Sequence, residues 1–165
     1  MNKTCFLLLF LSISFLTKAN DGAFYAVGNQ LIPIFETDIS VQKEILRITR
    51  INETDLKVEV DYEFYNPLDE KKLLVGFEAP SPAGDVDGRP KNGKHPYIKN
   101  FTVNINGKFI DYRTAIVTDE NYTKGNNIES KTLEEVIGKD FNPNAADFYY
   151  VNYFDVTFKK GINKI

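Results

Sequence analysis

The stretch LKVEVDYEFY, from Leu56 to Tyr65, constrains the fold of this chain more than any other. Apolar and aromatic side chains occupy every second position, and the positions between them hold charged residues: Lys57, Glu59, Asp61 and Glu63. An alternation of period two places the two kinds of side chain on opposite faces of a strand. The pattern therefore predicts a half-buried antiparallel strand, with the core on one side and water on the other.

Further segments have the composition of strands, and turn-forming residues separate them. The segment 39–51 changes phase near Lys43 and Glu44, which is the effect of a β-bulge. Asn106-Gly107 favours a type I′ turn, because both central residues of that turn need a positive φ. It predicts a hairpin between a strand at 101–105 and another at 108–116. The segments 73–79 and 148–158 predict two more strands.

One segment departs from the β pattern. In Thr132-Leu-Glu-Glu135 the threonine is placed to cap a first helical turn while Glu135 bonds back to it, and Gly138 suits the end of a helix. We therefore predict one short helix near 132–138. Many strands with close turns and little helix indicate an all-β fold, an antiparallel β-sandwich of the immunoglobulin-like kind. A closed barrel is the alternative architecture.

The N-terminus has the three parts of a secretory signal peptide: Lys3, an apolar run from Cys5 to Leu16, and a short polar stretch that ends at Ala19. The run is shorter than the roughly twenty apolar residues of a membrane-spanning helix. We predict cleavage after Ala19, export to the periplasm or cell surface, and no membrane span after cleavage. Residues 20–165 then form a single domain. We expect this domain to be truncated at its C-terminus, because the chain turns at Gly161 and begins a new strand shortly before it ends.

Composition excludes several kinds of site. Loss of Cys5 with the signal peptide leaves no cysteine, and so no disulfide, thiolate nucleophile or cysteine zinc site. His95 is the only histidine, whereas zinc hydrolases and serine nucleophiles depend on histidines in specific arrangements. Loss of Lys3 and Lys18 changes the formal net charge from −3 to −5, and no basic stripe is present for nucleic acid. We expect a non-catalytic protein. A carboxylate pair assembled from separate strands is the enzymatic alternative.

The segment SPAGDVDGRPKNGKHP, at 81–96, is a long connection without apolar periodicity. Connections of this length are uncommon unless they are functional or disordered, and its prolines restrict the backbone, so we predict an ordered recognition or packing loop. The candidate binding residues are Asp85, Asp87, Arg89, Lys91, His95 and Tyr97. Asp85 and Asp87, followed by a glycine, resemble part of a calcium loop. Calcium is thus the one cofactor candidate. Aspartates that bond to their own backbone in a turn are the alternative interpretation.

Two blocks of the sequence resemble an uncharacterised family of exported bacterial domains. They are DGAFYAVGNQLIPIFETDISVQKEIL, from Asp21, and VGFEAPSPAGDVDGRPKNGKHPYIKNFTVNING, from Val75. Some members of that family precede a small module called the YARHG domain. The resemblance covers residues 21–113 and implies a bacterial, extracytoplasmic, β-rich domain, but it brings no activity with it.

These features together predict an exported non-catalytic module, with a binding or structural role in the bacterial periplasm or at the cell surface. Its partner would be an envelope protein, a peptide or a glycan. Two alternatives belong to other classes: a carboxylate-based hydrolase, and an adhesion module stabilised by calcium.

Overall fold

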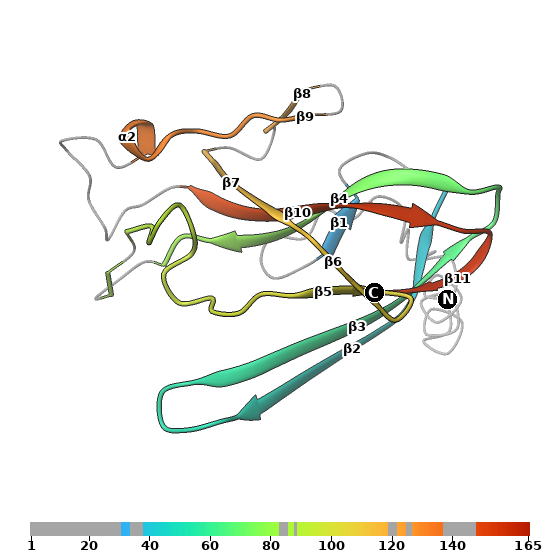
Figure 1. Ribbon diagram of the computed structural model, residues 1–165, viewed down its shortest axis with the longest axis horizontal. Coiled ribbons are helices and arrows are strands. Elements are labelled where there is room, and N and C mark those ends of the chain that lie inside the picture. Colours follow the sequence, from blue (N-terminus) through green and yellow to red (C-terminus); the bar gives the residue numbers. More distant parts are fainter. Residues whose placement is uncertain are drawn as a thin grey trace, which may run out of the picture.

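The computed structural model describes residues 31–33, 38–82, 86–87, 89–118, 122–124, 127–136 and 148–165. Within them the chain is all-β and antiparallel, with one short helix, α2 (Leu133–Val136) (Figure 1). The strands are β1 (Leu31–Pro33), β2 (Ser40–Arg50), β3 (Leu56–Asn66), β4 (Lys71–Pro80), β5 (Val103–Ile105), β6 (Lys108–Ile110), β7 (Arg113–Val117), β8 (Thr123–Lys124), β9 (Asn127–Ile128), β10 (Tyr149–Phe158) and β11 (Gly161–Lys164). The predicted fold class, a sandwich-like all-β protein, is confirmed.

The strands form two larger sheets and two short hairpins. One sheet has the order β1-β4-β10-β7 and the other the order β11-β3-β2, while β5 pairs with β6 and β8 with β9. Strand β10 pairs with β4 along its whole length and with β7 from Tyr149 to Tyr153. Where a strand lies between two neighbours and is covered on both faces, it needs apolar and aromatic side chains at consecutive positions. This explains the consecutive buried residues in the first half of β10, whereas Asp155 and Thr157 in its second half are exposed.

The main hydrophobic core joins the two larger sheets. Tyr62 and Phe64 of β3 pack in one cluster with Val75 of β4 and with Phe154 and Phe158 of β10. The rings of Phe64 and Phe158 meet edge to face, with 5.4 Å between their centroids. Full burial of a side chain of this size contributes roughly 2 kcal/mol to stability. Aromatic side chains therefore form a large part of the packing of β3 against the β4–β10 sheet.

The predicted short helix is confirmed over Leu133–Val136. The Thr132 amide donates to Glu135 Oε2 at 2.6 Å, and the Glu135 amide donates to Thr132 Oγ1 at 3.3 Å, which is the capping box that the sequence predicts. Leu133 and Val136 pack against a second cluster that contains Tyr150. Residues 137 and 138 of the predicted helix lie outside the described residues, and so does the predicted signal peptide, 1–19.

The Asn106-Gly107 turn is confirmed, with φ values of 49° and 87°, between β5 and β6. The prediction of a single strand at 108–116 is wrong in its middle, where Asp111 and Tyr112 separate β6 from β7. Strand β6 pairs with β5, whereas β7 pairs with β10. The chain leaves the β5–β6 hairpin before it joins the larger sheet. The alternation of apolar and polar residues therefore continues through 108–116, but the strand pairing is interrupted at Asp111 and Tyr112.

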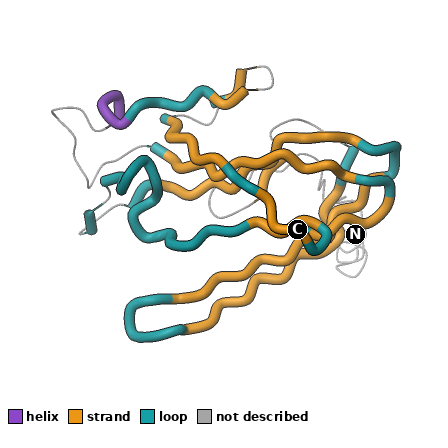
Figure 2. Tube along the Cα trace, viewed as in Figure 1, coloured by secondary structure: helices purple, strands orange, loops and turns teal. Residues whose placement is uncertain are grey.

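The β2–β3 hairpin gives a second correction. Its register shifts between Val41 and Lys43, which confirms the predicted bulge. However, β3 does not bury one entire face, because Leu56 and Val58 are 62% and 58% exposed. The distal half of the hairpin extends away from the sheet that covers Tyr62 and Phe64 (Figure 2), so the same apolar face is buried at one end and open at the other.

In the described part of the chain the helix α2 has four residues, whereas a membrane-spanning helix needs roughly twenty apolar ones, so no candidate membrane span is found there.

Candidate functional site

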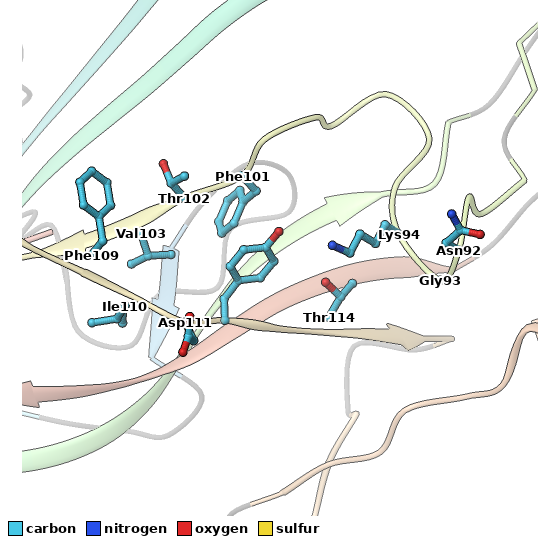
Figure 3. Close-up of a pocket in the computed structure, with 11 residues that line it drawn as sticks. Asn92, Gly93, Lys94, Phe101, Thr102, Val103, Phe109, Ile110, Asp111 and Thr114 are labelled. Atoms are coloured by element: carbon cyan, nitrogen blue, oxygen red, sulfur yellow. The ribbon is translucent and has the colours of Figure 1, made fainter.

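The described part of the chain contains an open groove with a volume of about 460 Å³. It lies where the 92–94 turn, the segment that leads into β5, strand β6 and the start of β7 come together (Figure 3). Its lining consists of Asn92, Gly93, Lys94, Phe101, Thr102, Val103, Phe109, Ile110, Asp111, Tyr112 and Thr114. Three stretches of the chain, 92–94, 101–103 and 109–114, therefore build one surface.

Aromatic rings form part of the groove wall. The rings of Phe101 and Tyr112 meet edge to face at 4.9 Å, and Phe101 also lies 5.3 Å from Phe77, which packs against the main core. The Lys94 ammonium lies 5.9 Å from the centroid of the Tyr112 ring. A cation at that distance from a ring is weakly attracted to it. The wall is thus anchored to the core and carries a positive charge beside an aromatic surface.

Phe109 lies at one end of the groove, away from Asn92 at the other end (Figure 3). Its side chain is 76% exposed, the largest value among the exposed large apolar side chains of the described residues. An apolar ring in this position gains roughly 2 kcal/mol when a partner covers it completely. Phe109 is therefore the side chain best placed to anchor a ligand.

The polar lining of the groove suits hydrogen bonding. Thr114 Oγ1 donates to the buried Asn152 Oδ1 at 2.7 Å, so the Thr114 hydroxyl is held in place at the groove surface. Asp111 is the single carboxylate among the eleven lining residues. A glycosidase mechanism requires a second carboxyl group to complete the acid and base pair.

A tight turn positions Lys94. Lys91 and Lys94 exchange backbone hydrogen bonds at 3.0 and 3.1 Å, and Asn92 and Gly93 between them have φ values of 54° and 71°. Asparagine and glycine are the residues that adopt positive φ at the lowest cost. The local sequence Lys-Asn-Gly-Lys therefore dictates the turn that brings Lys94 to the groove.

His95 holds the loop that follows this turn. Its Nδ1 accepts hydrogen bonds from the Tyr97 amide at 3.2 Å and the Ile98 amide at 3.1 Å, and its ring lies 5.0 Å from that of Tyr150. Burial lowers the pKa of His95, and this effect outweighs a hydrogen bond with the Pro80 backbone that raises it. A neutral imidazole that accepts through Nδ1 donates through Nε2, so His95 connects the loop to the end of β4.

The structure describes four more of the predicted site residues in this loop: Asp87, Arg89, Lys91 and Tyr97. Asp87 Oδ1 accepts from the Arg89 amide at 3.1 Å, which is the backbone-bonded turn named above as the alternative to calcium. The Lys91 ammonium lies 5.8 Å from the Tyr97 ring, and the rings of Tyr97 and His95 are 6.3 Å apart. The loop thus brings Lys91, His95 and Tyr97 together.

Tyr150 connects Asp87 to this group. Burial raises the pKa of the Tyr150 phenol, and the negative charge of Asp87 adds to the effect.

None of the predicted binding residues that the structure describes lines the groove. The loop contributes Asn92, Gly93 and Lys94 to the groove instead. Two sequence features could have indicated the groove. One is the turn-forming pair Asn92-Gly93, and the other is Phe109, which closely follows the Asn106-Gly107 turn.

The calcium hypothesis stays a prediction. Asp85 lies outside the described residues, and those that are described contain no group of three or more His, Cys, Asp or Glu side chains that could hold a metal. A thermal melt in calcium and in chelator tests it, because an ion that binds only the folded state raises the melting temperature. Identical melts would contradict the calcium site at Asp85 and Asp87.

No family model, no curated protein and no solved structure matches this chain.

Proposed function

We propose that this chain is an exported, non-catalytic module of the bacterial periplasm or cell surface that binds a segment of an envelope protein in the groove. The proposal rests on the 76% exposed ring of Phe109, which lines the same groove as the core-anchored Phe101–Tyr112 pair. Exposed aromatic side chains next to a preformed hollow are typical of binding anchors.

Export is supported by the sequence. The lysine, apolar run and polar stretch of residues 1–19 have the order of a secretory signal peptide. The blocks that begin at Asp21 and Val75 resemble exported bacterial domains. A protein of the envelope is therefore the partner class that fits the compartment.

The groove lining favours a polypeptide over a sugar. The chain contains no tryptophan, the side chain with the largest flat surface for stacking on sugar rings. The exposed Phe109 ring instead suits an aliphatic or aromatic side chain of a partner. Lys94 and Asp111 add one charge of each sign, and a peptide backbone or a charged side chain would pair with them.

The described chemistry supports binding without turnover. Asp111 has no second carboxyl group in the groove lining, and Nδ1 of His95 already accepts two backbone hydrogen bonds. A general base must have its nitrogen or oxygen within reach of the substrate proton. His95 Nδ1 is directed at the backbone of its own loop instead.

A phage-displayed peptide library, selected on the immobilised mature domain, tests the proposal. Selected peptides are synthesised and titrated by calorimetry against the wild type, Phe109→Ala and the control Leu68→Ala. Leu68 is also exposed, at 56%, but lies in the turn between β3 and β4 and not in the groove lining. We expect F109A to weaken binding at least about tenfold and L68A to leave it unchanged.

Both substitutions should leave the fold intact, because exposed side chains contribute little to stability. Equal affinities for wild type and F109A would contradict the groove as the binding surface. Selective binding to envelope glycans in place of peptides would replace the partner class, and hydrolysis of any ligand would contradict the non-catalytic function.

A further inference from the structure

Most of the groove is built from a strongly basic stretch of the chain. From Arg89 to Ile110 the sequence contains no aspartate and no glutamate. The basic residues of this stretch are Arg89, Lys91, Lys94, Lys99 and Lys108. Because these are five positive charges in a chain of formal net charge −3, the rest of the chain carries −8. The groove is therefore a positive region on an acidic protein.

The charges nearest the groove are free to bind an anion. The side chains of Arg89, Lys91 and Lys94 are exposed, and none of them has an ion-pair partner in the part of the chain that the structure describes. Lys99 differs, because its ammonium group pairs with Asp55 at 3.0 Å. The unpaired positive charge is thus concentrated at 89–94, on and beside the turn that lines one end of the groove.

Tyrosine rings lie close to the two lysines of this turn. The Lys91 ammonium lies 5.8 Å from the centroid of the Tyr97 ring, and the Lys94 ammonium lies 5.9 Å from that of Tyr112. The attraction between an ammonium group and an exposed ring is weak, so it favours these positions without neutralising the charge. Both charges therefore stay available at the groove.

Two carboxylates border the basic stretch, Asp87 before it and Asp111 after it. Asp87 is outside the groove lining, and its Oδ1 accepts from the Arg89 amide at 3.1 Å. Asp111 lines the groove together with Lys94, so these two formal charges offset each other. Lys91, which exchanges backbone hydrogen bonds with Lys94, adds the excess of positive charge.

The apolar and basic parts of the groove are a few residues apart. Phe109 lies at one end and Lys94 toward the other (Figure 3). Phe109 and Tyr112 are three positions apart, which spans at most about 10 Å of extended chain, and the Lys94 ammonium lies near the Tyr112 ring. A bound strand advances about 3.3 Å per residue. Side chains that reach Phe109 and Lys94 would therefore come from residues about three or four positions apart in the ligand.

We propose that the groove selects an acidic segment of its partner polypeptide. One aromatic or aliphatic residue of the segment covers Phe109, and aspartate or glutamate residues about three or four positions away pair with Lys94 and Lys91. The inference rests on the function proposed above and adds the chemistry of the partner. Complementary charges speed encounter and reject wrong partners, so a basic segment is disfavoured in the same groove.

A phosphate-rich envelope polymer is the other kind of anion that a basic turn could bind. Such a polymer would pair with Lys91 and Lys94 but would leave the 76% exposed ring of Phe109 uncovered. A polypeptide supplies an apolar side chain and carboxylates together. It is therefore the occupant we assign, and the polymer is an outcome of the test.

The experiment repeats the phage-display selection with three forms of the full chain. They are the wild type, the double variant Lys91→Glu with Lys94→Glu, and the control Lys159→Glu with Lys160→Glu. Both double variants change the net charge equally, but Lys159 and Lys160 are exposed in the turn between β10 and β11, outside the groove lining. The hydrogen bonds of the 91–94 turn are between backbone groups, so K91E/K94E keeps them.

We expect the wild type and the control to enrich acidic residues at least about twofold over the unselected library, and K91E/K94E to enrich basic residues instead. A synthetic peptide enriched on the wild type is then titrated by calorimetry. Its affinity should fall at least about tenfold in K91E/K94E, because attractions become repulsions, and should be unchanged in the control. The affinity should also weaken as the ionic strength rises from about 0.01 M to about 1 M, since the screening length falls from about 30 Å to about 3 Å.

Enriched peptides with no excess of acidic residues would overturn the inference, and they would leave the proposed function standing if Phe109→Ala still weakens them. Equal losses in the two double variants would also overturn it, since that result indicates net charge alone. Inorganic polyphosphate that displaces the peptide and binds more tightly would assign the basic turn to a polymer and overturn the acidic polypeptide. A library that yields no binder, or binders indifferent to Phe109→Ala, would instead contradict the proposed function itself, and the inference with it.

Discussion

Replacement of His95 by alanine should loosen the loop that presents Lys94 to the groove. The substitution removes the acceptor for the Tyr97 and Ile98 amides, a hydrogen bond with the Pro80 backbone and the ring contact with Tyr150. Each hydrogen bond contributes about 1 kcal/mol and an edge-to-face ring contact somewhat less. His95 is only partly buried, and water replaces some of these interactions. We therefore expect a loss of about 2 kcal/mol, or about 5 °C in melting temperature.

His95→Asn is the matched control for this experiment. An asparagine side-chain oxygen can accept from the backbone amides two and three positions ahead, so it keeps the turn while it removes the ring. We expect H95N to lose about 1 kcal/mol, roughly half the loss of H95A.

The pH dependence of this stability has a definite sign. Burial holds the pKa of folded His95 below its ordinary value of 6.5. As the pH falls below 6.5, the unfolded chain takes up a proton while the folded chain does not, so protonation favours unfolding. The stability that neutral His95 contributes is therefore complete above pH 6.5 and is lost progressively below it. Because the chain has no other histidine, the difference between wild type and H95N isolates this effect.

The assay is urea denaturation of wild type, H95A and H95N at a series of pH values between about 5 and 8, the range in which histidine charges change. The stability advantage of wild type over H95N should shrink as the pH falls. An advantage that grows at low pH, or an H95A variant as stable as wild type, would refute the structural role of His95.

Three further predictions concern stability and are checked by the same denaturation method. Asn163→Ala should lower the free energy of unfolding by about 2 to 4 kcal/mol, because the buried Asn163 side chain donates to the Lys159 and Gly161 carbonyls and accepts from the Lys159 amide. A loss below about 1 kcal/mol would contradict this role. Thr132→Ala should lower the free energy of unfolding by about 1 kcal/mol through the lost helix cap, and further replacement of Glu135 should add little, since both residues form one capping box. A double variant whose loss equals the sum of the two single losses would contradict the capping box. Leu46→Ser should lower the free energy of unfolding by less than about 1 kcal/mol and Phe64→Ala by about 3 to 5 kcal/mol, because Leu46 is exposed and Phe64 is buried on the same face of the hairpin. Similar losses for the two variants would contradict the exposure of the distal part of this face.

Local patterns in the sequence predicted the local structure well. The Asn106-Gly107 turn, the capping box at Thr132 and the bulge in β2 follow from residue types within a few positions of one another. The alternation in 56–65 also identified which side chains share a face. It could not show whether that face is covered, because burial of Phe64 and exposure of Leu56 depend on where the β4–β10 sheet ends.

The candidate site was harder to predict for the same reason. The groove combines residues as far apart as Asn92 and Thr114, and it exists because β5 and β6 form a hairpin beside β7. The sequence drew attention to the charged and histidine positions of the 81–96 loop, which are conspicuous by residue type. His95 instead bonds to the backbone of its own loop, while Phe109 became conspicuous only through its exposure.

The most direct test of the binding function is a map of amide chemical shifts in the isotope-labelled domain as a selected peptide is added. We predict that the largest changes lie at 92–94, 101–103 and 109–114, around the exposed ring of Phe109. Changes confined to other parts of the molecule, with the amides around Phe109 unaffected at saturation, would contradict it.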